Sequence, residues 1–140
     1  MDIDKEEYEL ACGIAEKAHE GQFRYDGVTP YITHPRQVAD QVSGYFAKSI
    51  AILHDVIEDC DGYTADTLHA LGVDPVVVQA VEVLTHPKEE PYAEYIERVA
   101  RYGLTAKIKL ADMIVNLADG PTEAQKKKYV KYTPILFAVI

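Results

Sequence analysis

The sequence has few cysteines, no long apolar run and no excess of basic residues, and each shortage excludes a class of protein. Its 140 residues include two cysteines, Cys12 and Cys60, which form neither a CxxC pair nor a disulfide framework. Two free thiols in a chain of this size are typical of a reducing compartment, so we expect a cytoplasmic protein. No apolar stretch approaches the roughly 20 residues of a membrane span, so no membrane association is expected. The acidic N-terminus, MDIDKEEYEL, lacks the apolar core of a signal peptide.

The charge balance is acidic. The chain has 14 Lys and Arg against 23 Asp and Glu, which gives a formal net charge of −9. Proteins that bind DNA or RNA through the phosphate backbone need a basic face, so we expect no nucleic-acid binding. An acidic protein that binds a phosphorylated small molecule must concentrate positive charge locally. A divalent metal ion is the strongest local positive charge available to it.

Helix signals recur along the whole chain, and no segment shows the sustained period-2 alternation of a strand. Capping residues, Pro at helix starts and Gly at helix ends place the boundaries. We therefore predict an all-α protein, with residues 1–140 forming a single helical bundle of about seven to eight helices. The first predicted helix begins after Asp4 and ends at Gly21, and residues 22–33 are predicted to be a loop. The next five predicted helices run over 35–42, 47–59, 64–72, 74–84 and 91–103. A seventh is capped by Thr105, and an eighth is capped by Thr122 and interrupted at Pro134.

Histidines and carboxylates stand in otherwise apolar segments. In the predicted helix 47–59, the apolar stretch IAIL is followed by HDVIED. Its ionisable residues pair at a spacing of four, which places each pair on one helical face. Asp and Glu are almost never fully buried unless they are paired or bind a metal, so a divalent cation would explain them. The candidate residues are His34, His54, Asp55, Glu58, Asp59 and Asp112.

The type of metal follows from the donor atoms. Two imidazoles with two carboxylates suit Mn²⁺, Fe²⁺ or Co²⁺ better than Ca²⁺, and the set lacks the thiolates of a structural zinc site. Each residue also has a plain structural interpretation. His34 before a proline fits a loop, Asp112 fits a solvated position, and Glu58 with Asp59 fits the polar end of a helix. The run 126–128, three lysines, is interpreted as a solvated helical face. Spacing alone therefore indicates a candidate metal site and no more.

Taken in order, these motifs resemble the HD-domain superfamily of metal-dependent phosphohydrolases. More narrowly, they resemble the (p)ppGpp hydrolase domain of Rel/SpoT enzymes and the Mesh1-like small alarmone hydrolases. The resemblance covers most of the chain and implies an all-α fold. It is carried by AHEGQFR (18–24), TPYITHPRQVA (29–39), AILHDVIED (51–59), LGVDPVVVQAVEVLTH (71–86) and IKLADMIVNLAD (108–119).

The resemblance implies a role for most of the candidates. The implied reaction removes the 3′-pyrophosphate from guanosine tetra- or pentaphosphate, usually with Mn²⁺, although Mg²⁺ is also compatible. Arg24 and Asn116 match positions near the nucleotide, and Glu58 with Asp59 matches the acidic pair that acts on water. Chemistry adds Lys109 as a phosphate contact and Tyr25 as an aromatic face for a base. The implied metal ligands are His34, His54, Asp55 and Asp112.

Three positions depart from the family pattern. Tyr25, Met113 and Ala118 stand where the family usually has basic residues. The substrate therefore stays open between guanosine tetraphosphate and another nucleotide, and a non-catalytic metal- or nucleotide-binding sensor is a third alternative. The complete ligand set with its acidic pair favours an enzyme. Because the chain ends soon after the last predicted helix, a second copy in a homo-oligomer is one expected source of a further pocket wall.

Overall fold

A computed structural model describes residues 4–140. Residues 1–3, the start of the acidic N-terminal segment, lie outside the described residues. Residues 4–140 form nine helices and no strand; Phe23 and Pro30 make one isolated β-bridge. The all-α prediction is therefore confirmed. The helices are α1 (Lys5–Ala18), α2 (Thr33–Asp40), α3 (Tyr45–Leu53), α4 (Val56–Asp59), α5 (Ala65–Ala70), α6 (Pro75–Leu84), α7 (Tyr92–Val99), α8 (Gly103–Leu117) and α9 (Glu123–Phe137).

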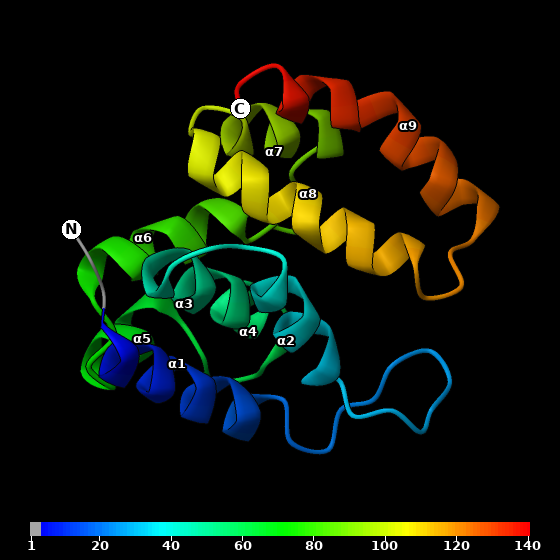
Figure 1. Ribbon diagram of the computed structural model, residues 1–140. Coiled ribbons are helices and arrows are strands. Elements are labelled where there is room, and N and C mark those ends of the chain that lie inside the picture. Colours follow the sequence, from blue (N-terminus) through cyan, green and yellow to red (C-terminus); the bar gives the residue numbers. More distant parts are fainter. Residues whose placement is uncertain (1–3) are drawn as a thin grey trace.

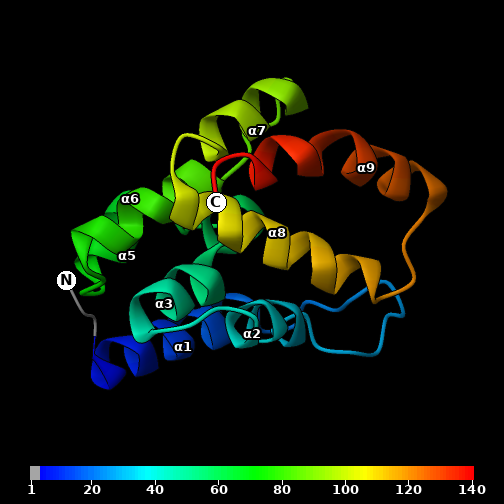
Figure 2. The same cartoon turned by 45° about the horizontal axis from the view of Figure 1, so that its top comes forward.

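Helix α3 lies at the centre of the fold. It packs against α1, α2, α6 and α8 (Figure 1), and its residues from Ile50 to Leu53 are fully buried. Helix α8 lies between α9 on one side and the pair α2 and α3 on the other (Figure 2). The apolar segment IAIL therefore forms the core, as its composition predicts, and His54, which follows it directly, is also buried.

Four of the predicted helix caps are confirmed, whereas Thr105, the predicted cap of the seventh helix, lies inside α8. Each capping side chain accepts a hydrogen bond from a backbone N–H in the first turn of its helix, which satisfies a donor that the helix leaves free. Gly21, with a φ of 81°, turns the chain out of α1 into the long loop before α2. The pairs are Asp4 with Glu7, Thr64 with Thr67, Asp74 with Val76 and Thr122 with Gln125.

The predicted helix 47–59 is wrong in one respect that matters for the site. The chain forms two helices instead, α3 and α4, with His54 and Asp55 between them. The Ala51 carbonyl accepts the His54 backbone N–H at 3.4 Å and lies 2.6 Å from the His54 ring Nδ1. Because this carbonyl is committed to His54, the regular i to i+4 ladder is broken there. The extra helix end accounts for nine helices in the described chain.

Three further helix boundaries differ from the prediction. Helix α2 begins at Thr33, so His34 lies in a first helical turn rather than in a loop. Gly103 begins α8 instead of ending the previous helix, and the hydroxyl of Thr105 donates to the Val99 carbonyl at 2.7 Å. Helix α9 continues through Pro134, because four residues earlier the chain is exposed and water can satisfy the carbonyl that lacks a donor.

Two expectations from composition can be compared with the structure. Cys12 and Cys60 are both free thiols. Among residues 4–140, no helix combines the length and the apolarity that crossing a bilayer requires.

Candidate metal centre

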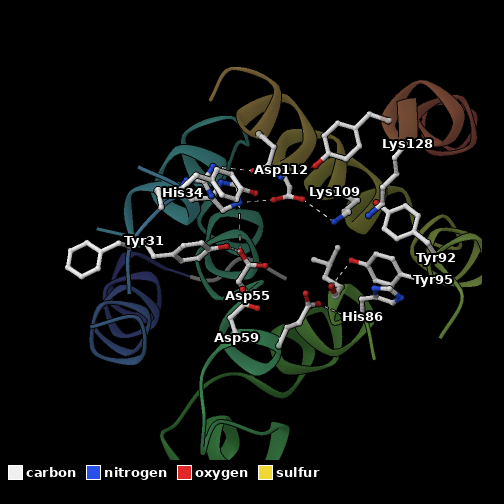
Figure 3. Close-up of a pocket in the computed structure, with 17 residues that line it drawn as sticks. Tyr31, His34, Asp55, Asp59, His86, Tyr92, Tyr95, Lys109, Asp112 and Lys128 are labelled. Carbon is white, nitrogen blue, oxygen red and sulfur yellow. Dashed lines mark hydrogen bonds and ion pairs between the residues drawn. The ribbon is translucent and has the colours of Figure 1, made fainter. Parts of the chain in front are cut away.

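Four side chains from three parts of the chain meet at one point. His34 comes from α2, His54 and Asp55 come from the α3–α4 junction, and Asp112 comes from α8. One ligand atom from each lies within 4.8 Å of the others. Asp112 Oδ1 lies 2.7 Å from His34 Nε2 (Figure 3). His54 Nε2 lies 3.2 Å from Asp112 Oδ1 and 3.1 Å from Asp55 Oδ2. The fold thus assembles the predicted ligand set.

The carboxylates of this cluster are stabilised by nearby positive charge. His34, His54 and Asp112 are only 2%, 3% and 5% exposed. Burial alone would lower the pKa of His54, but the nearby carboxylates of Asp55 and Asp112 outweigh it and raise that pKa well above its usual value. Burial would likewise raise the pKa of Asp112, but Lys109 and the two imidazoles hold it well below its usual value. A divalent cation would supply the charge that these carboxylates need.

Neighbouring groups orient the ligands in the way that metal sites require. The Nδ1 contact of His54 with the Ala51 carbonyl leaves its Nε2 facing the cluster. The Tyr31 hydroxyl donates to Asp55 Oδ2 at 2.7 Å, and Lys109 Nζ donates to Asp112 Oδ2 at 3.0 Å. Such second contacts fix the rotamer and the basicity of a ligand. The donor types, their spacing and these supports fit a divalent metal ion.

The acidic pair on α4 faces the same space. Asp59 N–H donates to the Asp55 carbonyl at 2.9 Å, so these two residues keep the spacing of one helical turn. The predicted common face for His54 and Glu58 is wrong, because the helix is broken between them. Glu58 Oε1 instead accepts the His86 backbone N–H at 2.7 Å. Burial, with the charges of Asp55 and Glu58, raises the pKa of Asp59 to about 7.

A cavity of about 320 Å³ opens beside the cluster. Nine of the ten predicted site residues line it, and His54 lies buried behind them. The sequence predictions do not include several aromatic residues of the lining, which come from the loop before α2, the segment after α6, α7 and α9. The full lining is Phe23, Arg24, Tyr25, Tyr31, His34, Asp55, Glu58, Asp59, Leu84, His86, Tyr92, Tyr95, Lys109, Asp112, Asn116, Lys128 and Tyr129.

Arg24 joins the loop before α2 to the end of α8. Its Nε donates to Asp119 Oδ2 at 2.9 Å, and its Nη2 donates to Asn116 Oδ1 at 3.3 Å. The Arg24 guanidinium also lies 5.1 Å from the centroid of the Tyr25 ring, which is 76% exposed. The predicted nucleotide contacts Arg24, Tyr25 and Asn116 are therefore close together, and Arg24 is already paired with a carboxylate.

The three departures from the family pattern are not equivalent in the structure. Only Tyr25 lines the cavity. Met113 is 1% exposed and belongs to the hydrophobic core, so a charged side chain there would be buried in apolar surroundings. Ala118 lines a neighbouring groove with Arg24 and Asp119. The loss of positive charge at the cavity itself is therefore smaller than the sequence suggests.

One basic residue of the predicted solvated face 126–128 contributes to the cavity. Lys128 of α9 lines it, and its Nζ lies 3.7 Å from the centroid of the Tyr92 ring. Lys126 and Lys127 do not line it and are exposed, so the solvated-face interpretation holds for them. The three lysines are consecutive, and no sequence signal separates them. Tyr31, by contrast, lies inside the motif TPYITHP, so its sequence position could have indicated it.

Comparisons with known proteins agree with this picture. No protein-family model matches the chain. It is 51% identical over 59 residues to a guanosine-3′,5′-bis(diphosphate) 3′-pyrophosphohydrolase of Haemophilus influenzae, and 48% identical over 52 residues to the protein of the same name from Vibrio cholerae. These matches cover 39% and 34% of this chain but only 8% and 7% of those longer proteins.

A solved structure matches almost the whole chain. It is that of a metazoan ortholog of SpoT, described as hydrolysing ppGpp and as playing a role in starvation responses. The match has a TM-score of 0.77 and 24% sequence identity, and it covers 99% of this chain and 87% of that one. In a segment of its sequence and in its whole fold, the chain therefore resembles HD-domain (p)ppGpp 3′-pyrophosphohydrolases, as its motifs indicated.

Proposed function

We propose that the chain is a metal-dependent phosphohydrolase that removes the 3′-pyrophosphate of guanosine tetra- or pentaphosphate and leaves GDP or GTP. One observation carries the proposal: a four-ligand cluster and two further carboxylates open into the same cavity. The substrate comes from the printed names of the similar proteins. In this proposal residues 1–140 act as one HD-type domain, in the cytoplasm, on a nucleotide of the stringent response.

In the proposed site His34, His54, Asp55 and Asp112 hold the ion, with Mn²⁺ preferred over Fe²⁺, Co²⁺ or Mg²⁺ because the donors mix imidazole with carboxylate. The ion, when bound, activates water and neutralises charge on the phosphoryl oxygens. Asp59 lines the cavity beside the ligands and accepts the proton of the attacking water; in the metal-free protein, burial and the charges of Asp55 and Glu58 raise its pKa to about 7. Glu58, fixed by the His86 N–H, orients that water.

The remaining predicted residues contact the substrate in this proposal. Arg24, Tyr25 and Asn116 hold the nucleoside, with the Tyr25 ring as a stacking surface. Lys109 lies within hydrogen-bond distance of the ligand Asp112, so its ammonium is placed to donate to a phosphoryl oxygen beside the ion.

The first test is the release of pyrophosphate from guanosine tetraphosphate at increasing Mn²⁺. We expect no release without metal. His54→Ala and Asp55→Ala should each lower the rate by at least about 100-fold, since losing a ligand costs more than losing its support. The matched control is Asp66→Ala, an exposed carboxylate on α5 that should leave the rate unchanged. An active Asp55→Ala variant, or a wild-type protein inert with Mn²⁺, would refute the proposal.

One observation favours a second substrate class, another nucleotide. The Arg24 guanidinium is already neutralised by Asp119, so the nucleoside side of the cavity offers little free positive charge. A panel of nucleotides, followed by phosphate and pyrophosphate detection, separates the two. Guanosine tetraphosphate turned over far faster than the rest supports the first proposal, whereas binding of nucleotides without turnover of any of them indicates a sensor.

A further inference from the structure

Two lysines stand on one side of the cavity. Lys109 Nζ lies 5.3 Å from the centroid of the Tyr95 ring, and Lys128 Nζ lies 3.7 Å from that of Tyr92. The centroids of these two rings are 5.6 Å apart, so the ammonium groups lie over neighbouring rings. Figure 3 shows both lysines on the side of Asp112 that faces away from Tyr31.

These lysines differ in how their charge is balanced. Lys109 is paired with Asp112, at 3.0 Å. No ion pair joins Lys128 to any carboxylate of residues 4–140. Partial burial, and then the positive charge of Lys109, lower the pKa of Lys128, because a second cation nearby disfavours its charged form. An anion between them would relieve that repulsion.

The charge of the whole lining also indicates that an anionic ligand would bind near the two lysines. Four carboxylates and three cationic side chains line the cavity. With Arg24 balanced by Asp119, a divalent ion and the two lysines bring the lining to zero net charge, on a chain whose own net charge is −9. Since the Arg24 charge is taken by Asp119, the charge available to a ligand is concentrated at the ion and at the two lysines.

The order of groups across the cavity indicates which part of the substrate the two lysines would contact. Arg24 lies next to Tyr31, 5.6 Å from its ring centroid, and Tyr31 bonds to the cluster from that side. The cluster follows, then Lys109, then Lys128 (Figure 3). A nucleoside held at Arg24 with its phosphoryl group at the cluster would therefore direct whatever lies beyond that phosphorus toward the lysines.

We propose that Lys109 and Lys128 form the subsite for the terminal phosphoryl group of the diphosphate that is cleaved, and that Lys128 thereby selects a diphosphate over a monophosphate ester. This inference rests on the proposed function. In the reaction the water oxygen bonds to the inner phosphorus, and the bond from that phosphorus to the 3′ oxygen breaks. The water proton ends on the 3′ oxygen. The two lysines bind the pyrophosphate product until it dissociates.

The test is the binding of the product, because it needs no turnover. Inorganic pyrophosphate and inorganic phosphate are titrated into the protein by calorimetry, at a buffered free Mn²⁺ concentration that is equal for all variants. Wild type should prefer pyrophosphate. Lys128→Ala should weaken pyrophosphate about tenfold, the size of one charge-assisted hydrogen bond, and leave phosphate nearly unchanged. Lys128→Arg should restore the preference.

The matched control is Lys127→Ala, which removes the same charge from the neighbouring position outside the cavity. If Lys127→Ala weakens pyrophosphate as much as Lys128→Ala, only the overall charge matters and the subsite is refuted. A wild type without preference for pyrophosphate also refutes it. Thermal melting of each variant separates loss of the site from loss of the fold, because Lys128 also packs on Tyr92.

The outcomes distinguish the subsite from the proposed function. A Lys128-dependent pyrophosphate preference without hydrolysis of guanosine tetraphosphate supports the subsite and refutes the proposed substrate. Hydrolysis of that nucleotide with equal KM and kcat in wild type and Lys128→Ala, together with unchanged pyrophosphate binding, refutes the subsite and leaves the proposed function standing.

Discussion

The two sides of the cavity are built on different principles. On the ligand side, α2, the α3–α4 junction and α8 bring buried imidazoles and carboxylates into direct contact. On the lysine side, α7 contributes the rings of Tyr92 and Tyr95, and Lys128 of α9 lies over the Tyr92 ring. Charge fixes the geometry of the first side, whereas aromatic packing fixes that of the second. Changes of charge on the ligand side should therefore alter metal binding, whereas changes of aromatic packing on the lysine side should alter stability and leave metal binding unchanged.

The largest effect expected from this contrast is that of pH on metal binding. Asp55 and Asp112 outweigh burial and raise the pKa of His54 well above 6.5, so a proton occupies the metal-free cluster near neutral pH. Mn²⁺ must displace that proton. Its affinity should rise by up to about tenfold per pH unit between pH 6 and 8, measured by calorimetry in buffers of different ionisation enthalpy. An affinity that stays constant over this range would contradict the assignment.

The raised pKa of His54 also makes the stability of the metal-free protein depend on pH. Because the folded pKa of His54 is raised, its stabilising contribution is complete below the unfolded value near 6.5 and is lost as pH rises through the folded value. The melting temperature of the metal-free protein should thus lose this contribution on going to alkaline pH. Saturating Mn²⁺ should reverse the trend, since it takes the place of the proton.

The next effect concerns the support of a ligand. Tyr31→Phe removes the hydroxyl that donates to Asp55 but keeps the ring, which packs between His19 and His34. The affinity for Mn²⁺ should fall about tenfold, as is usual when a ligand loses its outer partner. Tyr45→Phe, on α3 and away from the cluster, is the control. Equal affinities in the two variants would mean that Tyr31 does not orient the ligand.

The smallest effect belongs to the lysine side. The Tyr95 hydroxyl donates to the Leu84 carbonyl at 2.6 Å, in a buried position. Tyr95→Phe should lower the free energy of unfolding by about 1 kcal/mol in urea denaturation, since it leaves a carbonyl without a donor. Mn²⁺ affinity should stay unchanged. Tyr102→Phe, at an exposed ring, controls for the substitution, and a loss of metal binding in Tyr95→Phe would mean that the two sides are not independent.

Local chemistry made the ligand side a candidate metal site from the sequence alone, and the resemblance in its ordered motifs then singled out the four ligands. Carboxylates after IAIL are out of place in a core unless something binds them, and Asp112 is anomalous in the same way within KLADMIVNL. Capping residues such as Thr64 and Asp74 likewise act through their own first turn, so their helices begin where the sequence predicts.

What could not be predicted depends on tertiary context. The helix break at His54 depends on the contact between its ring Nδ1 and the Ala51 carbonyl, which hydrophobic periodicity does not predict. Lys128 and Lys127 are identical in sequence terms, and only the packing of α9 against α7 and α8 turns one of them to the cavity. Pro134 remained helical because its neighbourhood is open to water, a property of the surface and not of the residue.

The break at the α3–α4 junction has a mechanical consequence. Adjacent side chains of a regular helix diverge by about 100°, so an uninterrupted helix could not direct both His54 and Asp55 at one ion. With the break, a bound ion would tie that junction to α2 and α8. It would act as a removable cross-link between ligands 58 and 78 residues apart in the chain. At a free ion concentration of 100 times the dissociation constant of the ion, binding would stabilise the folded chain by about 2.7 kcal/mol.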